Sequence, residues 1–396
     1  MSKLRKDFPY FCNKQSYTYL DSASSTQKPK VMIEKLNYIY NYQYSNINRS
    51  FYKLSNQLTN SYEKVRELVA KLINAKNSKE IIFTKNATEA INLISYSFFF
   101  YNIKKEDEII ISIIDHHSNI IPWQQICKQY QTKIKIIKID INGNINIKEF
   151  YKIISRKTKL ISISLMSNIF GSIIDIKSII FIAKIYGIKI LLDVCQAILH
   201  LPINVYYLNC DFLVFSAHKL YSSTAIGILY GKYDLLKDMN IYQSGGSMIR
   251  EVTLNKTNFL FSPYKFEPGT PMISEIIVFG TTLQYLIKNE WQKYWKKELN
   301  LSKTIIKEIK KIKGYKIIGD QKTPIISIIH DYFHHSDIGE MLNYQNILIR
   351  TGHHCNQLLM KSLSIEGTIR ISLGIYNNFK DVEKLISSLY KLSNFV

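Results

Sequence analysis

The first half of the chain alternates short, strongly apolar segments with segments whose apolar residues recur at helical spacing. The apolar segments lie at 81–84, 109–114, 133–139, 160–165, 188–193, 211–216 and 226–230. Two segments between them have the helical pattern: 118–130, which Ser118 should cap, and 176–186, which should end at Gly187. Largely apolar strands with helices between them are typical of a mostly parallel sheet covered on both faces. The pattern therefore predicts an α/β fold whose functional loops lie at the carboxyl ends of the strands.

The pattern changes after about residue 260, where longer amphipathic segments alternate with short apolar ones. Helical spacing occurs at 274–287, 295–312, 338–344 and 381–392, and short strand-like runs occur at 315–318, 324–329, 347–350 and 368–372. This order of elements predicts a smaller α+β domain. We therefore expect a large α/β domain at 20–262 and a small α+β domain at 263–396, with the N-terminal segment 1–19 packed on the small domain.

The bulk composition is that of a soluble globular chain with room for two domains. The chain has 396 residues, of which 46% are hydrophobic. No apolar stretch reaches the roughly 20 residues of a membrane helix. The charged segment 1–7 also lacks the apolar region of a signal peptide. The sequence thus predicts a cytoplasmic protein that does not enter a membrane.

The cysteines are few and scattered. Five occur, at positions 12, 127, 195, 210 and 355, and no CxxC pair is present. An odd number at wide spacing argues against a disulfide framework and against a zinc site. We therefore expect free thiols, a reducing compartment and no bound metal.

The chain is strongly basic, with a formal net charge of +21 from 52 Lys and Arg against 31 Asp and Glu. Two explanations stay open. The first is a compositional bias, because lysine, isoleucine, asparagine and tyrosine are abundant, as in proteins from AT-rich genomes. The second is a functional electrostatic field that captures an acidic partner or a cofactor phosphate. The lysines form no long block, and no zinc finger or RNA-binding motif is recognisable. We expect no nucleic-acid partner.

Two of the expected strands end close to residues that suit one cofactor. Asp193 ends the run 188–193, where a buried carboxylate is costly unless it meets a cation; a helix cap or a core hydrogen bond is the alternative. Lys219 follows the run 211–216 and is either a surface lysine or a desolvated amine that can attack an aldehyde. Pyridoxal phosphate needs a Schiff-base lysine together with an acid on its ring nitrogen. The pair therefore favours this cofactor.

Polar residues near this pair could complete a cofactor site. Ser216 and His218 can hold phosphate oxygens, and Gln196 could donate to the phenolic oxygen of the ring. Thr88 lies in the first turn of a helix expected after the run 81–84. Free amide groups and the helix dipole favour a phosphate at such a position, although an ordinary helix cap is the alternative.

His116 follows the apolar run 109–114 and precedes a second imidazole, His117. A ring at that strand end could stack on an aromatic cofactor and take part in proton transfer, or it could be a structural histidine. A metal site is not favoured, because further ligands at suitable spacing are missing.

The sharpest signal is a thiol, Cys355, that stands directly after two imidazoles in the segment RTGHHC. A nucleophilic cysteine must be a thiolate, which nearby cations and hydrogen-bond donors favour; Arg350, His353 and His354 are close in sequence. Gly352 permits a loop conformation that other residues resist. The alternative is a buried bystander. The other four cysteines sit in apolar or regular segments and should be inert.

Arg370 lies on the short run 368–372 of the same expected domain. A guanidinium suits bidentate recognition of an amino acid's carboxylate, although a surface ion pair is the alternative. Together, the lysine, the thiol and this arginine indicate chemistry on a small amino acid, with sulfur passing through Cys355.

The chain resembles, over nearly its whole length, the group II cysteine desulfurases of the SufS type, which are fold-type I pyridoxal phosphate enzymes of aminotransferase class V. The most specific shared segments are RTGHHC at 350–355 and SAHKLY at 216–221. Supporting segments are DHHSN at 115–119, SN at 167–168, DVCQ at 193–196, GGSMI at 245–249 and FEPGTP at 266–271. The resemblance implies a mostly parallel, seven-stranded-type sheet with flanking helices, a smaller α+β C-terminal domain, and a homodimer.

The resemblance also implies a role for each matching residue. Lys219 would hold the cofactor through a covalent bond, and Asp193 would pair with its ring nitrogen. Gln196 and Asn168 would lie near the ring oxygen, and His116 would stack on the ring. The phosphate would be bound by Thr88, Ser216, His218 and the second subunit's Thr270. Arg370, with Asn168, would hold the substrate carboxylate, and Cys355 would receive the sulfur. His116 would join Lys219 and Cys355 as a catalytic residue.

The activity implied is the conversion of L-cysteine to L-alanine, with the sulfur captured as a persulfide on Cys355. A SufE- or SufU-type acceptor would then carry the sulfur to iron–sulfur cluster assembly in the SUF system. One alternative is a selenocysteine lyase, which would act on L-selenocysteine with the same cofactor. The other is a catalytically impaired scaffold of the same fold that mainly binds partners.

Departures from the family pattern motivate the scaffold alternative. Two histidines usual in the family are replaced within NRSFY, so that Asn48 and Tyr52 stand in their place. Ser222-Ser223 replaces the usual Gly-Pro after the lysine motif, and Asn86-Ala87 replaces Gly-Thr. These changes leave the lysine, aspartate, cysteine and arginine of the expected site intact.

Overall fold

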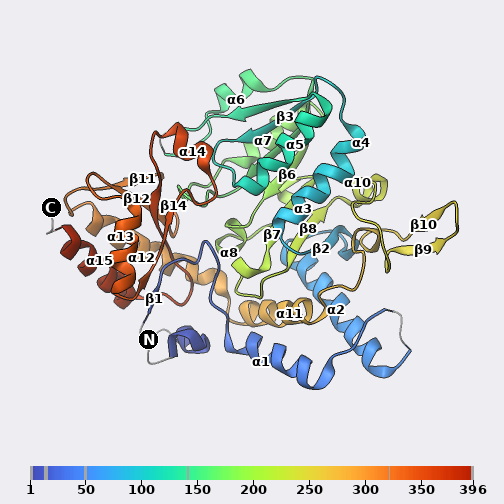
Figure 1. Ribbon diagram of the computed structural model, residues 1–396, viewed down its shortest axis with the longest axis horizontal. Helices are drawn as coiled ribbons and strands as arrows, with labels where there is room; N and C mark the ends of the chain where they lie inside the picture. The colour runs from blue at the N-terminus through green and yellow to red at the C-terminus, as the bar shows by residue number, and fades with distance from the viewer. Residues whose placement is uncertain (1–2, 13–16, 49–50, 141, 321, 394–396) are drawn as a thin grey trace.

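The computed structural model describes residues 3–12, 17–48, 51–140, 142–320 and 322–393 (Figure 1). Within these residues the largest sheet has seven strands in the order β2-β8-β7-β6-β5-β3-β4. Its strands are β2 (Ile81–Thr84), β3 (Glu108–Ser112), β4 (Lys133–Ile137), β5 (Thr158–Ser164), β6 (Lys189–Asp193), β7 (Phe212–Ser216) and β8 (Gly227–Gly231). β8 runs antiparallel to both of its neighbours, and the other pairs are parallel. The α/β fold with a mostly parallel sheet is thus confirmed, and each predicted strand ends within two residues of its predicted bounds.

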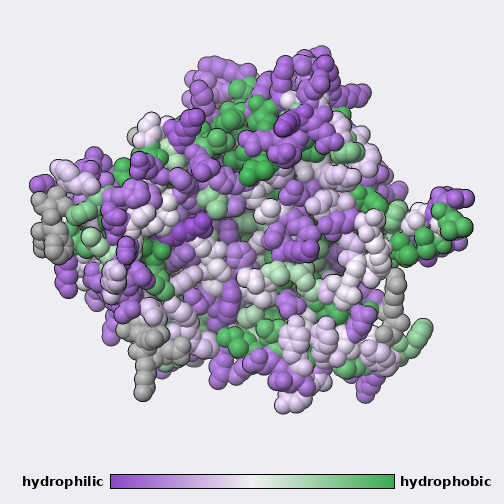
Figure 2. All heavy atoms as spheres, in the orientation of Figure 1, coloured by the Kyte–Doolittle hydropathy of each residue, from purple (hydrophilic) through white to green (hydrophobic). Residues whose placement is uncertain are grey.

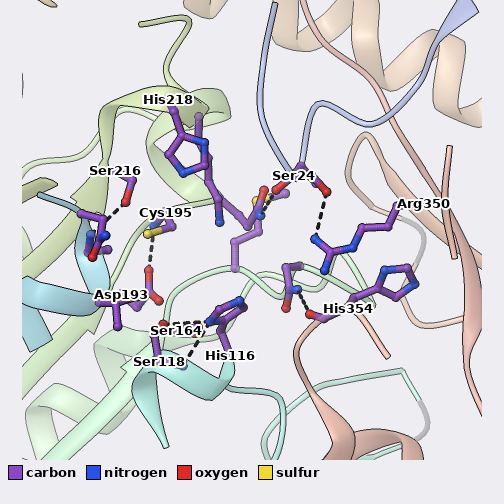
Figure 3. A pocket seen from close by; sticks show the side chains of 18 of the residues that line it. Ser24, His116, Ser118, Ser164, Asp193, Cys195, Ser216, His218, Arg350 and His354 are labelled. Atoms are coloured by element: carbon purple, nitrogen blue, oxygen red, sulfur yellow. Dashed lines mark hydrogen bonds between the residues drawn. The ribbon is translucent and has the colours of Figure 1, made fainter. Parts of the chain in front are cut away.

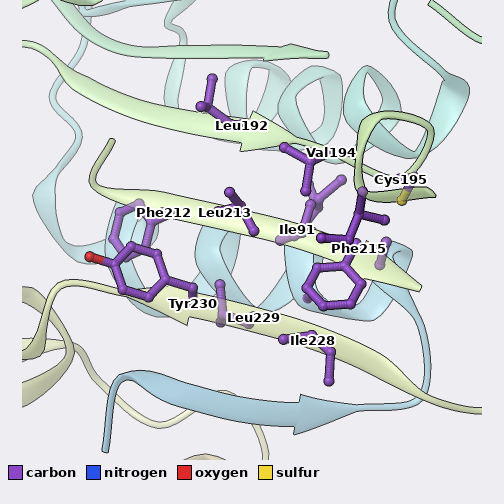
Figure 4. Close-up of a cluster of buried hydrophobic side chains, with 14 of the residues drawn as sticks. Ile91, Leu192, Val194, Cys195, Phe212, Leu213, Phe215, Ile228, Leu229 and Tyr230 are labelled. Atoms are coloured by element: carbon purple, nitrogen blue, oxygen red, sulfur yellow. The ribbon is translucent and has the colours of Figure 1, made fainter. Parts of the chain in front are cut away.

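Burial explains why the central strands of this sheet are largely apolar. Leu192 of β6 and Leu213 and Phe215 of β7 are fully buried, and Ile91 of α3 (Ala87–Ile94) lies against the same part of the sheet (Figure 4). Burying one large apolar side chain contributes about 1.5–3 kcal/mol. A sheet interior with this stability leaves polar side chains to the strand ends, where the candidate site forms.

The helix predicted at 118–130 begins later than expected. α5 spans Ile121–Tyr130, with a proline in its first turn, and a 3₁₀ turn at His117–Asn119 precedes it. Ser118 does not cap this helix, so that prediction was wrong. The backbone N–H of Ser118 donates instead to Nδ1 of His116, because the imidazole takes the capping role for the 3₁₀ turn. The helix predicted at 176–186 forms as α7 (Ile176–Ile185).

A second, smaller sheet carries the C-terminal part of the site. It has the antiparallel order β11-β12-β15-β14, formed by β11 (Tyr315–Ile318), β12 (Ile325–His330), β15 (Thr368–Ser372) and β14 (Arg350–Gly352). Helices α12 (Tyr294–Ile309), α13 (His335–Tyr344) and α15 (Phe379–Ser393) accompany it and share its separate hydrophobic core. The strand predicted at 347–350 is divided, because β13 (Ile347–Leu348) pairs with β1 (Thr18–Tyr19) rather than with this sheet.

The N-terminal segment joins the two cores. Arg5 binds Asp381 of α15 through a salt bridge of 2.6 Å, while the ring of Phe8 packs edge-on against Tyr221 and Tyr376 in the larger core. α11 (Ile273–Lys288) also packs on the larger core, against α1 (Lys30–Tyr38) and α2 (Lys53–Leu72). The domain division at residues 262 and 263 stays a prediction.

The remaining helices and strands connect these layers. They are α4 (Phe100–Asn102), α6 (Ile147–Ile153), α8 (Ala197–His200), α9 (Val205–Leu208), α10 (Tyr233–Asp238), α14 (Gln357–Ser362), β9 (Ile249–Val252) and β10 (Thr257–Phe259). β9 and β10 form a hairpin that projects from the body of the molecule (Figure 1), and its tip is partly hydrophobic in the space-filling view (Figure 2). Val252 and Leu254 of this hairpin are exposed.

The turn between β7 and β8 holds two residues in the left-handed region of backbone conformation. Tyr221 has a φ of 59° and Ala225 a φ of 61°. Tyr221 is buried, and its hydroxyl accepts the N–H of Ile375, whereas Ala225 is exposed and its side chain gains little there. An L-residue in this region is strained by about 1–2 kcal/mol relative to the right-handed form, and glycine is not.

We expect the substitution Ala225→Gly to raise the free energy of unfolding by about 0.5–1 kcal/mol, because relief of the strain exceeds the extra entropy of glycine in the unfolded chain. Urea denaturation of the two proteins measures the change. Ala75→Gly is the matched control, since Ala75 has no positive φ and should not be stabilised. A lower stability of Ala225→Gly would contradict the expectation.

Candidate active site

A cavity of about 260 Å³ opens at the carboxyl ends of β5, β6 and β7 and faces the small sheet (Figure 3). Of the predicted site residues, nine line it: Thr88, His116, Asn168, Asp193, Gln196, Ser216, His218, Lys219 and Arg370. Cys355 stands beside it on a loop whose neighbours Arg350 and His354 do line it. Thr270 lies outside it and lines a different hollow, next to Thr84 and Glu89. The structure therefore brings together residues from three distant parts of the sequence.

One end of the cavity is built from the start of α3. The Asn86 side chain caps this helix by accepting the N–H of Glu89 at 2.8 Å, and the Ala87 N–H donates to the Ser216 hydroxyl at 2.9 Å. The β8 strand passes so close that a Cβ atom on Gly227 would meet the Asn86 backbone at 2.3 Å. Exposed Thr88 stands in the first turn. Amide and hydroxyl groups at a helix N-terminus suit a phosphate.

Lys219 follows β7 in a 3₁₀ turn that the N-terminal part of the chain holds in place. The carbonyl of His218 accepts the N–H and the hydroxyl of Thr26, and the Lys28 ammonium at 3.0 Å. Burial and the nearby Lys219 lower the pKa of the His218 imidazole to about 4, so its ring is neutral and can offer one N–H to an anion. The turn is thus fixed on the side away from the cavity.

Asp193, at the end of β6, is a buried carboxylate without a counter-ion. It is 6% exposed, and its Oδ1 accepts the N–H of Cys195 at 2.8 Å, yet it has no salt bridge within the described part of the chain. A buried charge of this kind calls for a cation in the cavity. Gln196 lies beside it, but its amide already donates to the carbonyl of Ala23 at 2.8 Å.

His116 is held in one orientation at the base of the cavity (Figure 3). Its Nδ1 accepts the N–H of Ser118 at 3.1 Å and lies 2.8 Å from the Ser118 hydroxyl. Burial, aided by the positive charge of Lys219, lowers the pKa of this ring to about 3. The preceding Asp115 is fully buried and accepts the N–H groups of Ser112 and Ser164; burial raises its pKa to about 7. His116 is therefore a neutral, rigid ring.

The opposite end of the cavity is cationic. Arg370 of β15 is 1% exposed, and its guanidinium donates to the carbonyl of Asn168 at 3.1 Å, to Asp21 at 3.0 Å and to the Ser24 hydroxyl at 2.7 Å. Its Nε has no partner in the described part of the chain. Burial lowers the pKa of Arg370, but a guanidinium remains charged at neutral pH. An arginine with an unused donor in a cavity can accept a carboxylate.

Cys355 sits on a tightly anchored loop. Gly352, His354 and Cys355 have φ values of 103°, 52° and 58°, so the chain turns sharply around the thiol. The Cys355 carbonyl accepts the N–H of His117 at 2.8 Å, and the Asn168 amide donates to the carbonyl of His354 at 2.9 Å. These bonds attach the loop to the large sheet.

Arg350 lies within hydrogen-bonding distance of the thiol. Nη2 of Arg350 lies 3.4 Å from Cys355 Sγ, while His353 is exposed to solvent. His354 is buried, its Nε2 lies 2.8 Å from the Thr368 hydroxyl, and burial lowers its pKa to about 2, so its ring carries no charge. Arg350 is therefore the one of the three expected neighbours that can stabilise a thiolate. Cys195 and Cys210 are buried, which raises the pKa of both thiols and makes them inert.

The sequence did not reveal Ser24 and Asp21 as parts of the site. Both follow β1 at the N-terminus and contact arginines more than 300 residues away. The departures at Asn48 and Tyr52 are exposed and do not line the cavity, and Arg49 and Ser50 lie outside the described residues. Within the described residues, His, Cys, Asp and Glu side chains form no group of three or more that could hold a metal. The described helices include none with the length and apolar character needed to span a membrane.

Comparison with known proteins agrees with this arrangement. Residues 18–385 match the aminotransferase class-V family. The chain belongs to the aminotransferase class-V family. A cysteine desulfurase of Wigglesworthia glossinidia brevipalpis is 38% identical over 100% of this chain and 98% of its own length. A cysteine desulfurase of Synechococcus elongatus is 36% identical over 98% of this chain, but this chain spans only 63% of that protein.

A solved cysteine desulfurase has nearly the same fold. The crystal structure of the cysteine desulfurase CsdA from Escherichia coli, as the S-sulfonic acid, gives a TM-score of 0.94 at 30% identity, covering 100% of this chain and 98% of that one. This confirms the predicted α/β fold of the pyridoxal phosphate enzymes. Membership of the family implies pyridoxal phosphate as the cofactor. The cavity fits it, because buried Asp193 forms no salt bridge with any described residue and the start of α3 suits a phosphate.

We expect Arg350→Ala to slow alkylation of Cys355 by iodoacetamide at neutral pH about three- to tenfold, the size of one net hydrogen bond to the thiolate. Peptide mapping by mass spectrometry measures each thiol separately. Exposed Cys12 is an internal control, because the hydrogen-bond partners of its sulfur among the described residues are the backbone carbonyls of Lys6 and Phe8. Equal slowing at both cysteines would contradict a specific contact between Arg350 and Cys355.

Proposed function

We propose that this protein is a pyridoxal phosphate-dependent cysteine desulfurase of the SufS-type group II, which converts L-cysteine to L-alanine and collects the sulfur as a persulfide on Cys355. The observation that carries the proposal is the position of the Cys355 loop. It stands at the rim of the one cavity that holds Lys219, Asp193 and Arg370, and Arg350 contacts both the thiol and the cavity. The cysteine desulfurases among the relatives support the same activity.

The cofactor would occupy the part of the cavity between α3 and β6. Lys219 would bind its aldehyde carbon, the Asp193 carboxylate would hold its ring nitrogen protonated, and neutral His116 would stack on its ring. Asn168 and Gln196 would lie near the ring oxygen, and Thr88, Ser216 and His218 would bind the phosphate. When bound, this cofactor supplies an electron sink for the amino acid attached to it.

The substrate would lie between the cofactor and the small sheet. Arg370, with Asn168 beside it, would bind the carboxylate of L-cysteine and direct its Cα–H toward the amine of Lys219, which takes that proton. The Cys355 thiolate would attack the substrate sulfur, so that an S–S bond forms as the substrate Cβ–S bond breaks. The electron pair of the broken bond stays on Cβ, which takes up one proton to become the methyl group, and Lys219 returns a proton to Cα to complete alanine.

Two partners follow from the same proposal. Thr270 lies outside the cavity of its own chain, so we assign it to the phosphate of a second subunit in a homodimer. The projecting β9–β10 hairpin with exposed Leu254 fits a contact surface in such a dimer. Cys355 is half-buried rather than enclosed, so its persulfide can meet an acceptor of the SufE or SufU type for iron–sulfur cluster assembly.

We expect Cys355→Ala to keep the visible absorbance of the bound cofactor and to release no alanine from L-cysteine, because it lacks the thiolate that attacks the sulfur. Lys219→Ala should lose the absorbance of the covalently bound cofactor as well. Absorbance spectra and quantified alanine measure both effects, and Cys12→Ala, which removes an exposed thiol, is the control that should retain activity. Normal alanine release by Cys355→Ala would refute the proposed function, and rates on L-selenocysteine would distinguish a lyase.

A further inference from the structure

The hydrogen bonds of Arg370 show a conflict with its proposed role in substrate binding. We propose that Ser24 is a positioning residue that occupies the carboxylate-binding nitrogen of Arg370 until the substrate's carboxylate displaces it, and that it thereby tunes selectivity for substrates with a carboxylate. This inference rests on the proposed function, since it concerns how the same site admits an amino acid.

The argument starts from the five N–H groups of the guanidinium. Nη1 donates to the Asn168 carbonyl at 3.1 Å, and both N–H groups of Nη2 are used, one by Asp21 Oδ1 at 3.0 Å and one by Ser24 Oγ at 2.7 Å. A carboxylate binds a guanidinium through two parallel bonds, either to Nε with Nη2 or to Nη1 with Nη2. Both arrangements need Nη2. Bidentate binding of a substrate therefore requires that Asp21 or Ser24 give up its bond.

Ser24 is the partner that gives way. Its hydroxyl is neutral, whereas Asp21 forms a salt bridge with a guanidinium that is 1% exposed, and breaking that bridge would leave a buried charge with weaker compensation. Ser24 also loses little. Its hydroxyl donates to Asp21 Oδ1 at 2.8 Å. It also accepts from Nη1 of Arg350 at 3.1 Å (Figure 3). Both bonds can persist when Nη2 of Arg370 binds the substrate instead.

The unused donor supports this sequence of events. Nε of Arg370 is buried without a partner in the described residues, which is unfavourable for a charged group. A carboxylate that takes Nε together with the nitrogen released by Ser24 would satisfy both. Arg370 thus has one unpaired donor, Nε, and a second donor, Nη2, that becomes available when the Ser24 hydroxyl releases it. The salt bridge to Asp21 keeps the guanidinium in place during this exchange.

The test compares ligands with and without a carboxylate on Ser24→Ala holoenzyme. We expect the KM for L-cysteine and the dissociation constant of L-alanine, measured by titration of the cofactor absorbance, to fall about three- to tenfold, the size of one net hydrogen bond that no longer has to be broken. The dissociation constant of cysteamine, which lacks the carboxylate, should not change. The value of kcat should change less than KM, because the exchange precedes the chemistry.

Ser22→Ala is the matched control. It removes a hydroxyl from the same segment, but that hydroxyl bonds to Tyr376 at 2.7 Å instead of to an arginine, so the ratio of L-alanine to cysteamine affinity should stay at the wild-type value. In Ser24→Ala this ratio is internal to one protein, so a general loss of folding or cofactor cancels. An unchanged ratio, or weaker binding of L-alanine alone, would overturn the inference. Failure of the wild-type protein to produce alanine would instead overturn the proposed function.

Discussion

The buried carboxylate of Asp193 is the constraint on which the site depends. It ends β6 among fully buried strands and accepts a backbone N–H, but no cation of the described chain pairs with it. A buried charge in that position is unfavourable on its own and becomes favourable when a protonated ring nitrogen lies against it. The parallel sheet creates this condition, because parallel β5, β6 and β7 all deliver their carboxyl ends to one edge.

The second sheet supplies what the first cannot. The large sheet brings a lysine, an aspartate and a neutral imidazole, whereas the guanidinium groups of Arg350 and Arg370 arrive on the adjacent antiparallel strands β14 and β15, directly opposite each other. The electrostatics of the cavity are therefore divided between two cores. The end near α3 is suited to one anion, the end near the small sheet to another, and Cys355 stands next to the second.

Much of this could be predicted from the sequence. The strands were predictable because β3 and β6 contain continuous apolar runs at 109–111 and 190–192. Asp193 and Lys219 stood out because a carboxylate at the end of one buried strand and a lysine just after the next together suit pyridoxal phosphate. The start of α5 could not be predicted, because the side chain of His116 caps the 3₁₀ turn before this helix and Ser118 does not cap the helix itself. The charge of His354 could not be predicted from the sequence either. Its burial, rather than its position beside Cys355, lowers the pKa of its ring and keeps the ring neutral.

Contacts between remote segments were the other blind spot. Ser24 belongs to no recognisable motif. It joins the site because β1 pairs with β13, which brings the N-terminal segment next to Arg350 and Arg370. Asp21 adds an isolated bridge to Ser372, the last residue of β15. No local pattern in the sequence encodes such a meeting; the tertiary fold alone supplies it.

The position of the segment 24–28 has a mechanical consequence. Ser24 forms hydrogen bonds with both Arg350 and Arg370. Thr26 and Lys28, two and four residues later, donate hydrogen bonds to the carbonyl of His218, which precedes Lys219. The amine at one end of the cavity and the guanidinium pair at the other are thus tethered to one stretch of backbone. A displacement of that stretch would therefore move both ends of the cavity in the same direction and alter the distance between them little.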